Sequence, residues 1–245
     1  MKTVNIFEDF PKIRPTLTAD FERIYKEHYK HNREGVGRVV SLAQKMESWM
    51  HKKVAEDSIK EGNKSTLEIG AGTLNQLKYE QPELFDIIEP FKELYENSPY
   101  RKHIRHFYSD IDEVDTAVKY DRIISIAAFE HILNLPHVVA KTALLLREKG
   151  VLRVTIPNEG SILWKLGWRL TTGIEFKLKY GLDYETLIKY EHVNTANEIE
   201  KVLLYFFKKH RCSCFGFGKK ISFYRFYECF EPNIEAAKNY IFIEK

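Results

Sequence analysis

The stretch TLEIGAGTLNQL, residues 66–77, decides how this chain of 245 residues is expected to fold. It reads as a short apolar strand that runs into a turn in which Gly70 and Gly72 flank Ala71. Glycine allows a positive φ and a close approach of ligand to backbone, and the N–H groups that begin a following helix point toward that ligand. Such a turn at the carboxyl end of a parallel strand indicates a site for a nucleoside-like cofactor.

The number of glycines in this turn does not choose between cofactor classes. A dinucleotide-binding turn, Gly-x-Gly-x-x-Gly, would place its third glycine at position 75, and a Gly-x-Gly-x-Gly turn would place it at position 74. The chain has Leu74 and Asn75 at these positions. An ordinary strand-to-helix turn therefore also stays open on this motif alone.

Length and composition restrict the class of protein. With 44% hydrophobic residues the chain can bury a sizeable core, and its length fits one large α/β domain with additions. No apolar run approaches the roughly 20 residues of a membrane-spanning helix, and a net charge of +3 gives no strong case for a nucleic-acid partner. Three cysteines and an N-terminus without an apolar signal segment indicate reduced thiols in a cytoplasmic protein.

Short apolar segments alternate with helical patterns from residue 65 onward, which predicts parallel pairing and right-handed crossovers. Strands are expected at residues 67–69, 86–90, 105–108, 120–126 and 151–156, with a closing pair near 212–217 and 240–243. The stretch 221–230 fits a helix or a strand. We therefore expect an α/β fold with a mainly parallel seven-stranded sheet flanked by helices over residues 65–245.

Two additions to this α/β domain are expected. Residues 1–64 carry helical periodicity at 19–30 and 34–55 and predict an N-terminal helical cap. Residues 159–194, approximately, interrupt the alternation after the fifth strand and read as a partly helical insertion. Thr195 and Glu198 then have the spacing of a capping box, which predicts that a helix begins there.

Two acids follow expected strands and suit a nucleoside. Glu89 ends the second strand, at about the 20-residue spacing from the glycine turn that ribose-binding acids show, and its carboxylate can accept both hydroxyl protons. The alternative is a helix cap or a surface acid. Asp110, followed by Ile111, ends the third strand, and the alternative there is a turn aspartate that caps the next helix.

A Glu-His pair, Glu130-His131, follows the fourth strand and Ala127. Together with Glu-x-Gly-x-Gly at residues 68–72, Glu89 and Asp110, in this order, it resembles the class I S-adenosylmethionine-dependent methyltransferases of small molecules. The resemblance covers about residues 66–160 and defines no subfamily. It implies a Rossmann-like fold and S-adenosylmethionine as cofactor, with Asp110 on the adenine amine. The implied cofactor contacts are Glu68, Gly70, Ala71, Gly72, Glu89, Asp110, Ile111 and Ala127.

Two histidines are candidates for the catalytic base. An unperturbed imidazole titrates near pH 6.5, so His131 suits removal of a proton from an acceptor, although it also suits a packing role. His192 lies in a second polar cluster, beside Glu191, where the insertion returns to the sheet. Two Glu-His pairs could suggest a metal, but neither has the i, i+4 spacing of a helical metal site. Methyl transfer needs no metal when a base deprotonates the acceptor, so no metal is expected.

The substrate is expected to contact the cap, the insertion and the Glu-His segments. Tyr25 and Tyr29 share one face of the first helix and suit either a cover over the cofactor or packing of the cap. Trp164 belongs to the aromatic-rich insertion, which suits a substrate lid or a partner surface. The expected substrate-binding residues are Tyr25, Tyr29, Glu130, Trp164 and Glu191.

Motifs that are missing from the sequence narrow the range of possible methyl acceptors. No Asn/Asp-Pro-Pro-aromatic motif follows the fourth strand, and all three cysteines lie beyond residue 210, which disfavours modification of nucleic-acid bases. We expect O- or N-methylation of a small molecule. A non-catalytic module that acts through protein contacts, or an NAD-dependent oxidoreductase, stays open. Replacement of Gly70 by Arg is expected to abolish cofactor binding without unfolding the chain. The acceptor and the oligomeric state stay unknown.

Overall fold

The computed structural model describes residues 7–24, 40–61, 64–80, 83–169 and 173–243. Seven strands form one sheet in the order β3-β2-β1-β4-β5-β7-β6. The strands are β1 Ser65–Ile69, β2 Leu84–Ile88, β3 Ile104–Tyr108, β4 Tyr120–Ile126, β5 Leu146–Pro157, β6 Phe207–Phe217 and β7 Ile221–Pro232. Five strands from β3 to β5 are parallel, whereas β7 runs antiparallel to β5 and β6. The mainly parallel, Rossmann-like sheet that the sequence predicts is thus confirmed.

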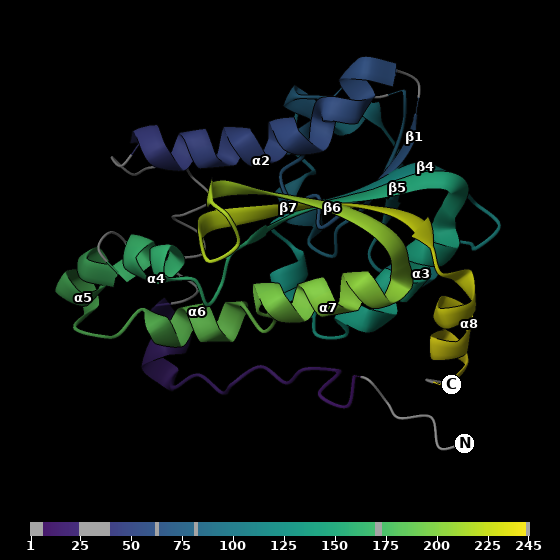
Figure 1. Cartoon of the computed structure of the whole chain (residues 1–245). Helices are drawn as coiled ribbons and strands as arrows, with labels where there is room; N and C mark the ends of the chain where they lie inside the picture. Colours follow the sequence, from purple (N-terminus) through teal and green to yellow (C-terminus); the bar gives the residue numbers. More distant parts are fainter. Residues whose placement is uncertain (1–6, 25–39, 62–63, 81–82, 170–172, 244–245) are drawn as a thin grey trace.

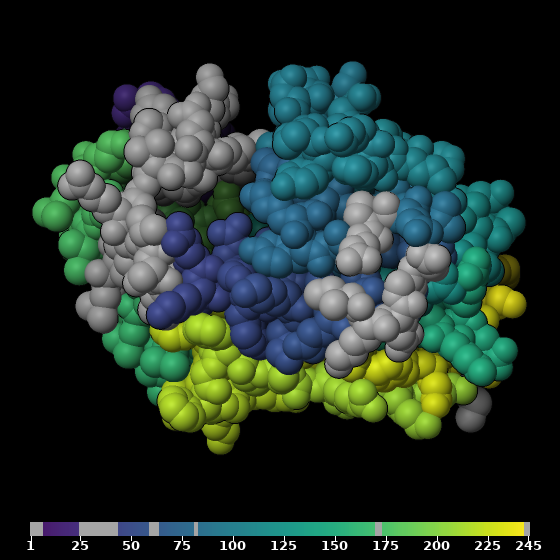
Figure 2. Space-filling model, turned by 90° about the horizontal axis from the view of Figure 1, so that it is seen from above, coloured from purple at the N-terminus to yellow at the C-terminus, as the bar shows by residue number. Residues whose placement is uncertain are grey.

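Helices cover both faces of this sheet (Figure 1). The α-helices whose bounds are described are α2 Val40–Glu61, α3 Leu135–Leu145, α4 Ile162–Trp168, α5 Ile174–Tyr180, α6 Glu185–Glu191, α7 Ala196–Phe206 and α8 Ile234–Ile243. Helix α2 lies on one face, and α3, α7 and α8 lie on the other. Figure 2 shows the α2 face from above, with α2 (blue) between the teal region of β2 and β3 and the yellow-green strands β6 and β7. None of the helices in the described ranges is long and apolar enough to cross a membrane.

The short central strand β1 is the apolar strand that the sequence predicts before the glycine turn. All five of its residues are buried, as expected for a parallel strand that is covered on both faces. Leu67 pairs with Ile123 of β4 and belongs with it and Leu152 of β5 to the same core cluster. This burial fixes the position of the turn that follows β1, and therefore the position of the candidate site.

The end of the chain differs from the prediction. Residues 240–243 do not form the last strand but the final turn of α8, and the sheet is closed by β6 and β7 instead. A short apolar run cannot by itself distinguish strand from helix. In the helix, Tyr240 packs against Phe206 and Phe7, while Phe242 is exposed. The ambiguous stretch 221–230 belongs to β7.

The predicted capping box at the start of α7 is confirmed. The Glu198 N–H donates to Thr195 Oγ1 at 3.3 Å, and the Thr195 N–H donates to Glu198 Oε2 at 2.8 Å. Both bonds satisfy N–H groups that a helix start would otherwise leave unpaired. The insertion before this helix consists of α4, α5 and α6, as the sequence analysis expected from its partly helical character.

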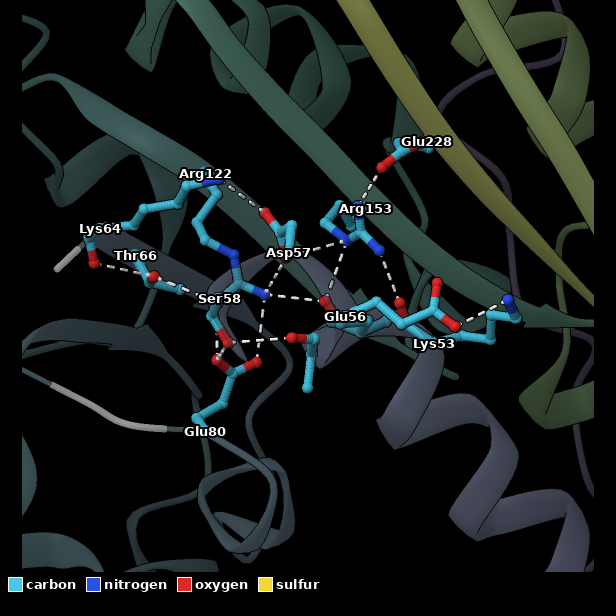
Figure 3. A network of polar contacts seen from close by, with 12 residues as sticks. Lys53, Glu56, Asp57, Ser58, Lys64, Thr66, Glu80, Arg122, Arg153 and Glu228 are labelled. Carbon is cyan, nitrogen blue, oxygen red and sulfur yellow. Dashed lines mark hydrogen bonds and ion pairs between the residues drawn. The ribbon is translucent and has the colours of Figure 1, made fainter. Parts of the chain in front are cut away.

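Buried ion pairs hold α2 against the sheet (Figure 3). The guanidinium groups of Arg122 from β4 and Arg153 from β5 both donate to the carbonyl oxygen of Val54 at 2.9 Å. Asp57 Oδ1 lies 3.1 Å from Arg122 Nη2 and 3.2 Å from Arg153 Nε, and Glu80 pairs with Arg122 at 2.9 Å. Helix α2 is thereby fastened to β4 and β5. The division into a cap of 1–64 and a domain of 65–245 stays a prediction.

Candidate functional site

The turn after β1 has the backbone conformation that its glycines permit. Gly70 has a φ of 72° and Gly72 a φ of 51°, both in the left-handed region. Leu74, at the position where a third glycine was missing, has a φ of 66° and is fully buried. A leucine in this conformation is strained, and its burial beside Leu77 and Phe85 holds it there. The turn thus keeps the conformation of a glycine-rich loop with a leucine in the third position.

Glu89 ties this turn to the loop after β2. Its Oε2 accepts a hydrogen bond from the Gly72 N–H at 2.8 Å, and its Oε1 accepts one from the Phe91 N–H at 3.0 Å. The Gly72 N–H therefore donates to Glu89 and not to a ligand. The helix that follows is the short 3₁₀ turn η1, Asn75–Lys78, so it supplies only a small helix dipole.

A cavity of about 720 Å³ opens at the carboxyl ends of β1, β2, β3 and β4. This is the edge of a parallel sheet where ligands of α/β proteins bind. Of the predicted cofactor contacts, Gly70, Gly72, Glu89, Asp110, Ile111 and Ala127 line the cavity, and so do His131 and Glu191. Its other lining residues are Arg14, Ile69, Ile88, Pro90, Phe91, Leu94, Ser109, Ala128, Ile132, Val138 and Tyr190.

Two predicted cofactor contacts do not reach this cavity. Ala71 is buried in the core, and Glu68 is 3% exposed within β1. Burial, reinforced by the charge of Glu80, raises the pKa of the Glu68 carboxyl well above 4.5. Its Oε2 has no hydrogen-bond partner in the part of the chain that the structure describes. Glu68 is therefore placed as a buried acid behind the turn.

Asp110 caps the next helical turn, which is the alternative that the sequence left open, and it also lines the cavity. Its Oδ1 accepts the N–H of Asp112 at 2.8 Å and so caps the 3₁₀ turn η4, Ile111–Glu113. The same residue lines the cavity beside Ile111. A role as helix cap and a role as ligand contact are thus compatible at this position.

The end of β4 carries a second strained turn. Ala127 has a φ of 49° and donates its N–H to the carbonyl of Thr155 at 2.8 Å. The turn brings Ala128 so close to Gly70 that a Cβ at position 70 would lie 2.5 Å from the Ala128 Cβ. Any side chain at position 70 would therefore strain both turns, so Gly70→Arg is expected to lower the stability of the fold as well as to block the cofactor.

The turn η5, Phe129–His131, brings the two candidate bases together. The His131 and His192 rings meet edge to face with centroids 4.8 Å apart. His131 Nδ1 lies 3.0 Å from the carbonyl oxygen of Glu191, and His192 Nδ1 lies 2.6 Å from Glu159 Oε1. His131 lines the cavity, whereas His192 contacts the His131 ring and is not among the lining residues.

Glu130 is buried beside these rings. It is 2% exposed, and Oε1 lies 3.8 Å from His131 Nε2. Burial raises the pKa of its carboxyl to about 7, although His131 opposes the shift. Its main-chain carbonyl accepts the N–H groups of Val193 and Asn194 at 2.8 and 3.1 Å, which fastens the end of the insertion to η5.

Trp164, a predicted substrate contact, supports His192 from the side of the insertion. Its ring stacks on the His192 ring with centroids 6.2 Å apart, and its Nε1 donates to Glu159 Oε1 at 3.1 Å. It does not line the cavity. Tyr25 and Tyr29, the other two aromatic candidates, lie outside the described residues.

Comparisons with known proteins support the fold. The sequence matches no known family profile and no curated protein. Among solved structures, a possible histamine N-methyltransferase from Thermotoga maritima is similar with a TM-score of 0.53 and 14% identity, over 86% of this chain and 97% of that chain. The plantazolicin methyltransferase BamL, crystallised with a desmethyl analogue and SAH (S-adenosylhomocysteine), has a TM-score of 0.55 and 11% identity, over 86% and 93%. This is the class I methyltransferase fold.

Sequence reasoning missed one prominent residue at the cavity of this class I methyltransferase fold. Residues 7–18 run as an extended strap along α6 and α7 (Figure 1), and Arg14 lines the cavity from this strap. Its Nη1 donates to the carbonyl of Tyr190 at 2.6 Å, and its Nη2 donates to the carbonyl of His131 at 2.9 Å. Arg14 belongs to no motif, so no signal in the sequence could have found it.

Proposed function

We propose that this chain is an S-adenosylmethionine-dependent methyltransferase that methylates an oxygen or nitrogen atom of a small molecule. The observation that carries the proposal is the composition of one cavity. Gly70 and Gly72, Glu89, and Asp110 come from three different strand ends and face the same space as His131. A cavity of about 720 Å³ lies within the range of small-molecule sites.

The cofactor would lie across the strand ends with its ribose near Glu89. Each oxygen of that carboxylate accepts one backbone N–H, and a carboxylate oxygen has a second lone pair with which to accept a hydroxyl proton. Asp110 would meet the adenine amine, and Ile111 and Phe91 offer apolar surface to the base. Ala127 and Gly70 would then face the methionine end, where the two strained turns approach most closely.

The chemistry would be an in-line displacement at the sulfonium methyl group. The leaving group is a neutral thioether and needs no acid, so the protein has to position the two reactants and, for a hydroxyl acceptor, to help remove one proton. His131 and His192 are the groups through which the protein would act on the acceptor. Glu130, Glu191 and Trp164 would shape the acceptor site around them, the last through its stacking on His192.

Structural neighbours make a small molecule or modified peptide a reasonable acceptor. One neighbour is a possible histamine N-methyltransferase, and another was crystallised with a desmethylplantazolicin analogue. We also propose that residues 1–64 form a cap in which Tyr25 and Tyr29 help to cover the acceptor. The free thiols of Cys212, Cys214 and Cys229 suit a cytoplasmic enzyme.

A second candidate is a methyltransferase-like module that acts through protein contacts. It is favoured by exposed apolar side chains of the insertion, Ile162 and Leu166 on one turn of α4 and Ile174 and Leu178 on one turn of α5. Exposed apolar groups that lie near one another on a surface are typical of interaction sites. This candidate and the enzyme make opposite predictions about methyl transfer.

The test is methyl transfer from S-[methyl-¹⁴C]adenosylmethionine to a panel of small amines, phenols, alcohols and azole peptides. We expect label in at least one acceptor with the wild type, and loss of that label with Glu89→Gln but not with Glu93→Gln, whose side chain is exposed outside the cavity. S-adenosylmethionine binding without transfer to any acceptor would favour the second candidate. Absence of both binding and transfer would refute the enzyme.

A further inference from the structure

Glu130, His131 and His192 form a cluster with the composition of a metal site. One ligand atom of each residue, a carboxylate oxygen or a ring nitrogen, lies within 4.8 Å of the other two. Ligands of a bound divalent cation stand about 2.0–2.2 Å from it, so they are separated from one another by roughly 3–4 Å. Small rotations of the three side chains would therefore bring them to ligand distance.

Both imidazoles are oriented as metal-binding histidines are. In such sites one ring nitrogen donates its N–H to a carboxylate or a backbone carbonyl, which leaves the other nitrogen's lone pair for the metal. His192 Nδ1 faces the Glu159 carboxylate at 2.6 Å, and His131 Nδ1 faces the Glu191 carbonyl at 3.0 Å. Nε2 is then the nitrogen that remains on each ring, and His131 Nε2 already lies 3.8 Å from Glu130 Oε1.

Glu130 supplies a second, independent observation. Its carboxyl is 2% exposed, and Oε2 has no hydrogen-bond partner in the described part of the chain. A buried polar oxygen without a partner costs free energy that a native structure normally avoids. A cation between Glu130 and the two imidazoles would offset this cost, and nothing in the proposed placement of the cofactor does so.

We propose that Glu130, His131 and His192 bind a divalent transition-metal cation beside the cofactor cavity. Two imidazoles and one carboxylate suit Zn²⁺, Mn²⁺, Fe²⁺ or Co²⁺ better than Ca²⁺ or Mg²⁺, which prefer oxygen ligands. Three protein ligands leave at least one position for an exogenous group. Because His131 also lines the cavity, that position faces the space that the acceptor would occupy.

The role of such a cation in methylation rests on the proposed function, whereas its binding does not. An acceptor hydroxyl on the cation would have a lowered pKa and lose its proton to water. Its oxygen would then form the bond to the methyl carbon while the carbon–sulfur bond breaks, leaving the electron pair on the neutral thioether. The histidines would serve as ligands, and no protein base would be required.

From the sequence, no metal is expected, because neither Glu-His pair has the spacing of a helical metal site. The structure brings the two Glu-His pairs together without that spacing. His131 comes from the turn after β4 and His192 from the end of the insertion, and they meet only because η5 and residues 193–194 are hydrogen-bonded. Glu191 contributes its carbonyl rather than its carboxylate.

The test is titration of tag-free, chelator-treated protein with Co²⁺ alone, followed by visible absorption and calorimetry. We expect one equivalent to bind with a d–d absorption band. Glu130→Gln and His192→Gln should each weaken binding more than about tenfold, and Glu159→Gln by about tenfold or more through loss of the oriented ring. The matched control is His137→Gln, a histidine that faces Asp112 outside the cluster and should leave the affinity unchanged.

A competing soft-metal site is tested in the same experiment. Cys212 and Cys214 lie two residues apart on β6, and thiolate ligands give a near-ultraviolet charge-transfer band that imidazoles do not. Loss of Co²⁺ binding in the Cys212→Ser/Cys214→Ser variant, with normal binding in His192→Gln, would overturn the proposal. Failure of the folded wild type to bind Co²⁺ would overturn it as well.

S-adenosylhomocysteine titration of the same samples separates this proposal from the proposed function. Retained S-adenosylhomocysteine binding by Glu130→Gln and His192→Gln would show that these variants are folded and that lost Co²⁺ binding is local. Binding of Co²⁺ without S-adenosylhomocysteine would support the metal site and contradict the methyltransferase. The reverse result would contradict the metal site alone.

Discussion

The Gly72 N–H donates to the Glu89 carboxylate at 2.8 Å and joins the turn after β1 to the loop after β2. Residues far apart in the chain thus form one edge of the cavity, with Phe91 held to the same carboxylate at 3.0 Å. This connection makes Glu89 both a structural element and the candidate ribose ligand. A substitution there should therefore affect stability and cofactor affinity together.

Glu89→Gln tests that double role. An amide has only one acceptor oxygen, so one of the two backbone N–H groups loses its partner, at a cost of about 1–3 kcal/mol in the free energy of unfolding. We expect the affinity for S-adenosylhomocysteine to fall at least tenfold, which is about 1.4 kcal/mol. Urea denaturation and calorimetry measure the two effects, with Glu93→Gln as the control. Unchanged affinity in Glu89→Gln would remove Glu89 from the cofactor site.

The two glycines of the turn should differ in their tolerance of alanine. Both have positive φ, which costs a residue with a Cβ about 1–2 kcal/mol. A Cβ at Gly72 meets nothing within 4 Å, whereas one at Gly70 lies 2.5 Å from the Ala128 Cβ. We expect Gly70→Ala to destabilise the chain by about 1–3 kcal/mol more than Gly72→Ala does. Equal losses in urea denaturation would mean that the two turns do not pack as described.

The buried ion pairs under α2 should be strongly coupled to stability. Arg122 is 0% exposed and pairs with Glu80 and Asp57. Arg122→Met therefore removes the cation that both carboxylates face. We expect the free energy of unfolding to fall by about 3–5 kcal/mol. Arg147 pairs with Asp121 at the surface, and Arg147→Met should cost about 0–1 kcal/mol. Similar losses for both variants in urea denaturation would contradict the network in Figure 3.

Glu68 should make stability depend on pH. Burial and the nearby charge of Glu80 raise the pKa of this carboxyl in the folded state well above 4.5. The folded state therefore holds this proton more tightly than the unfolded state does. The contribution of protonated Glu68 to the free energy of unfolding is fully present below pH 4.5. It is lost as the pH rises through the folded-state pKa of this carboxyl.

Glu68→Gln removes this titration while keeping the shape of the side chain. We expect the variant to gain stability relative to wild type as the pH rises from 4.5 to neutral, with the smallest difference at the acidic end. Urea denaturation of both proteins across this range measures the difference, and groups common to both proteins cancel. A difference that does not change with pH would mean that Glu68 is ionised normally in the folded chain.

Local patterns and the order of elements made much of the fold predictable. The buried strand β1, the strand β4 and the capping box at Thr195 each follow from residues that are close in sequence. The sequence predicts a strand at residues 240–243, where the structure has the end of α8, because a four-residue apolar run has no periodicity of its own. In the helix, Tyr240 of this run packs against Phe206, a contact that no local pattern encodes.

The candidate site was predictable only where it follows strand ends. The glycine turn, Glu89 and Asp110 were found because the carboxyl ends of parallel strands share one edge. Arg14 reaches the cavity from an extended strap, and His192 reaches His131 through the fold of the insertion. These placements result from tertiary contacts, so the sequence carried no separate signal for them.

Calorimetric titration of the full chain with S-adenosylhomocysteine, with NAD as the control, tests the central claim most directly. We expect S-adenosylhomocysteine to bind one site per chain with a Kd on the order of micromolar, about −8 kcal/mol, and NAD to give no heat of binding. Heat from NAD alone, or from neither ligand, would contradict the assignment of the cavity at Glu89 and Asp110 to S-adenosylmethionine.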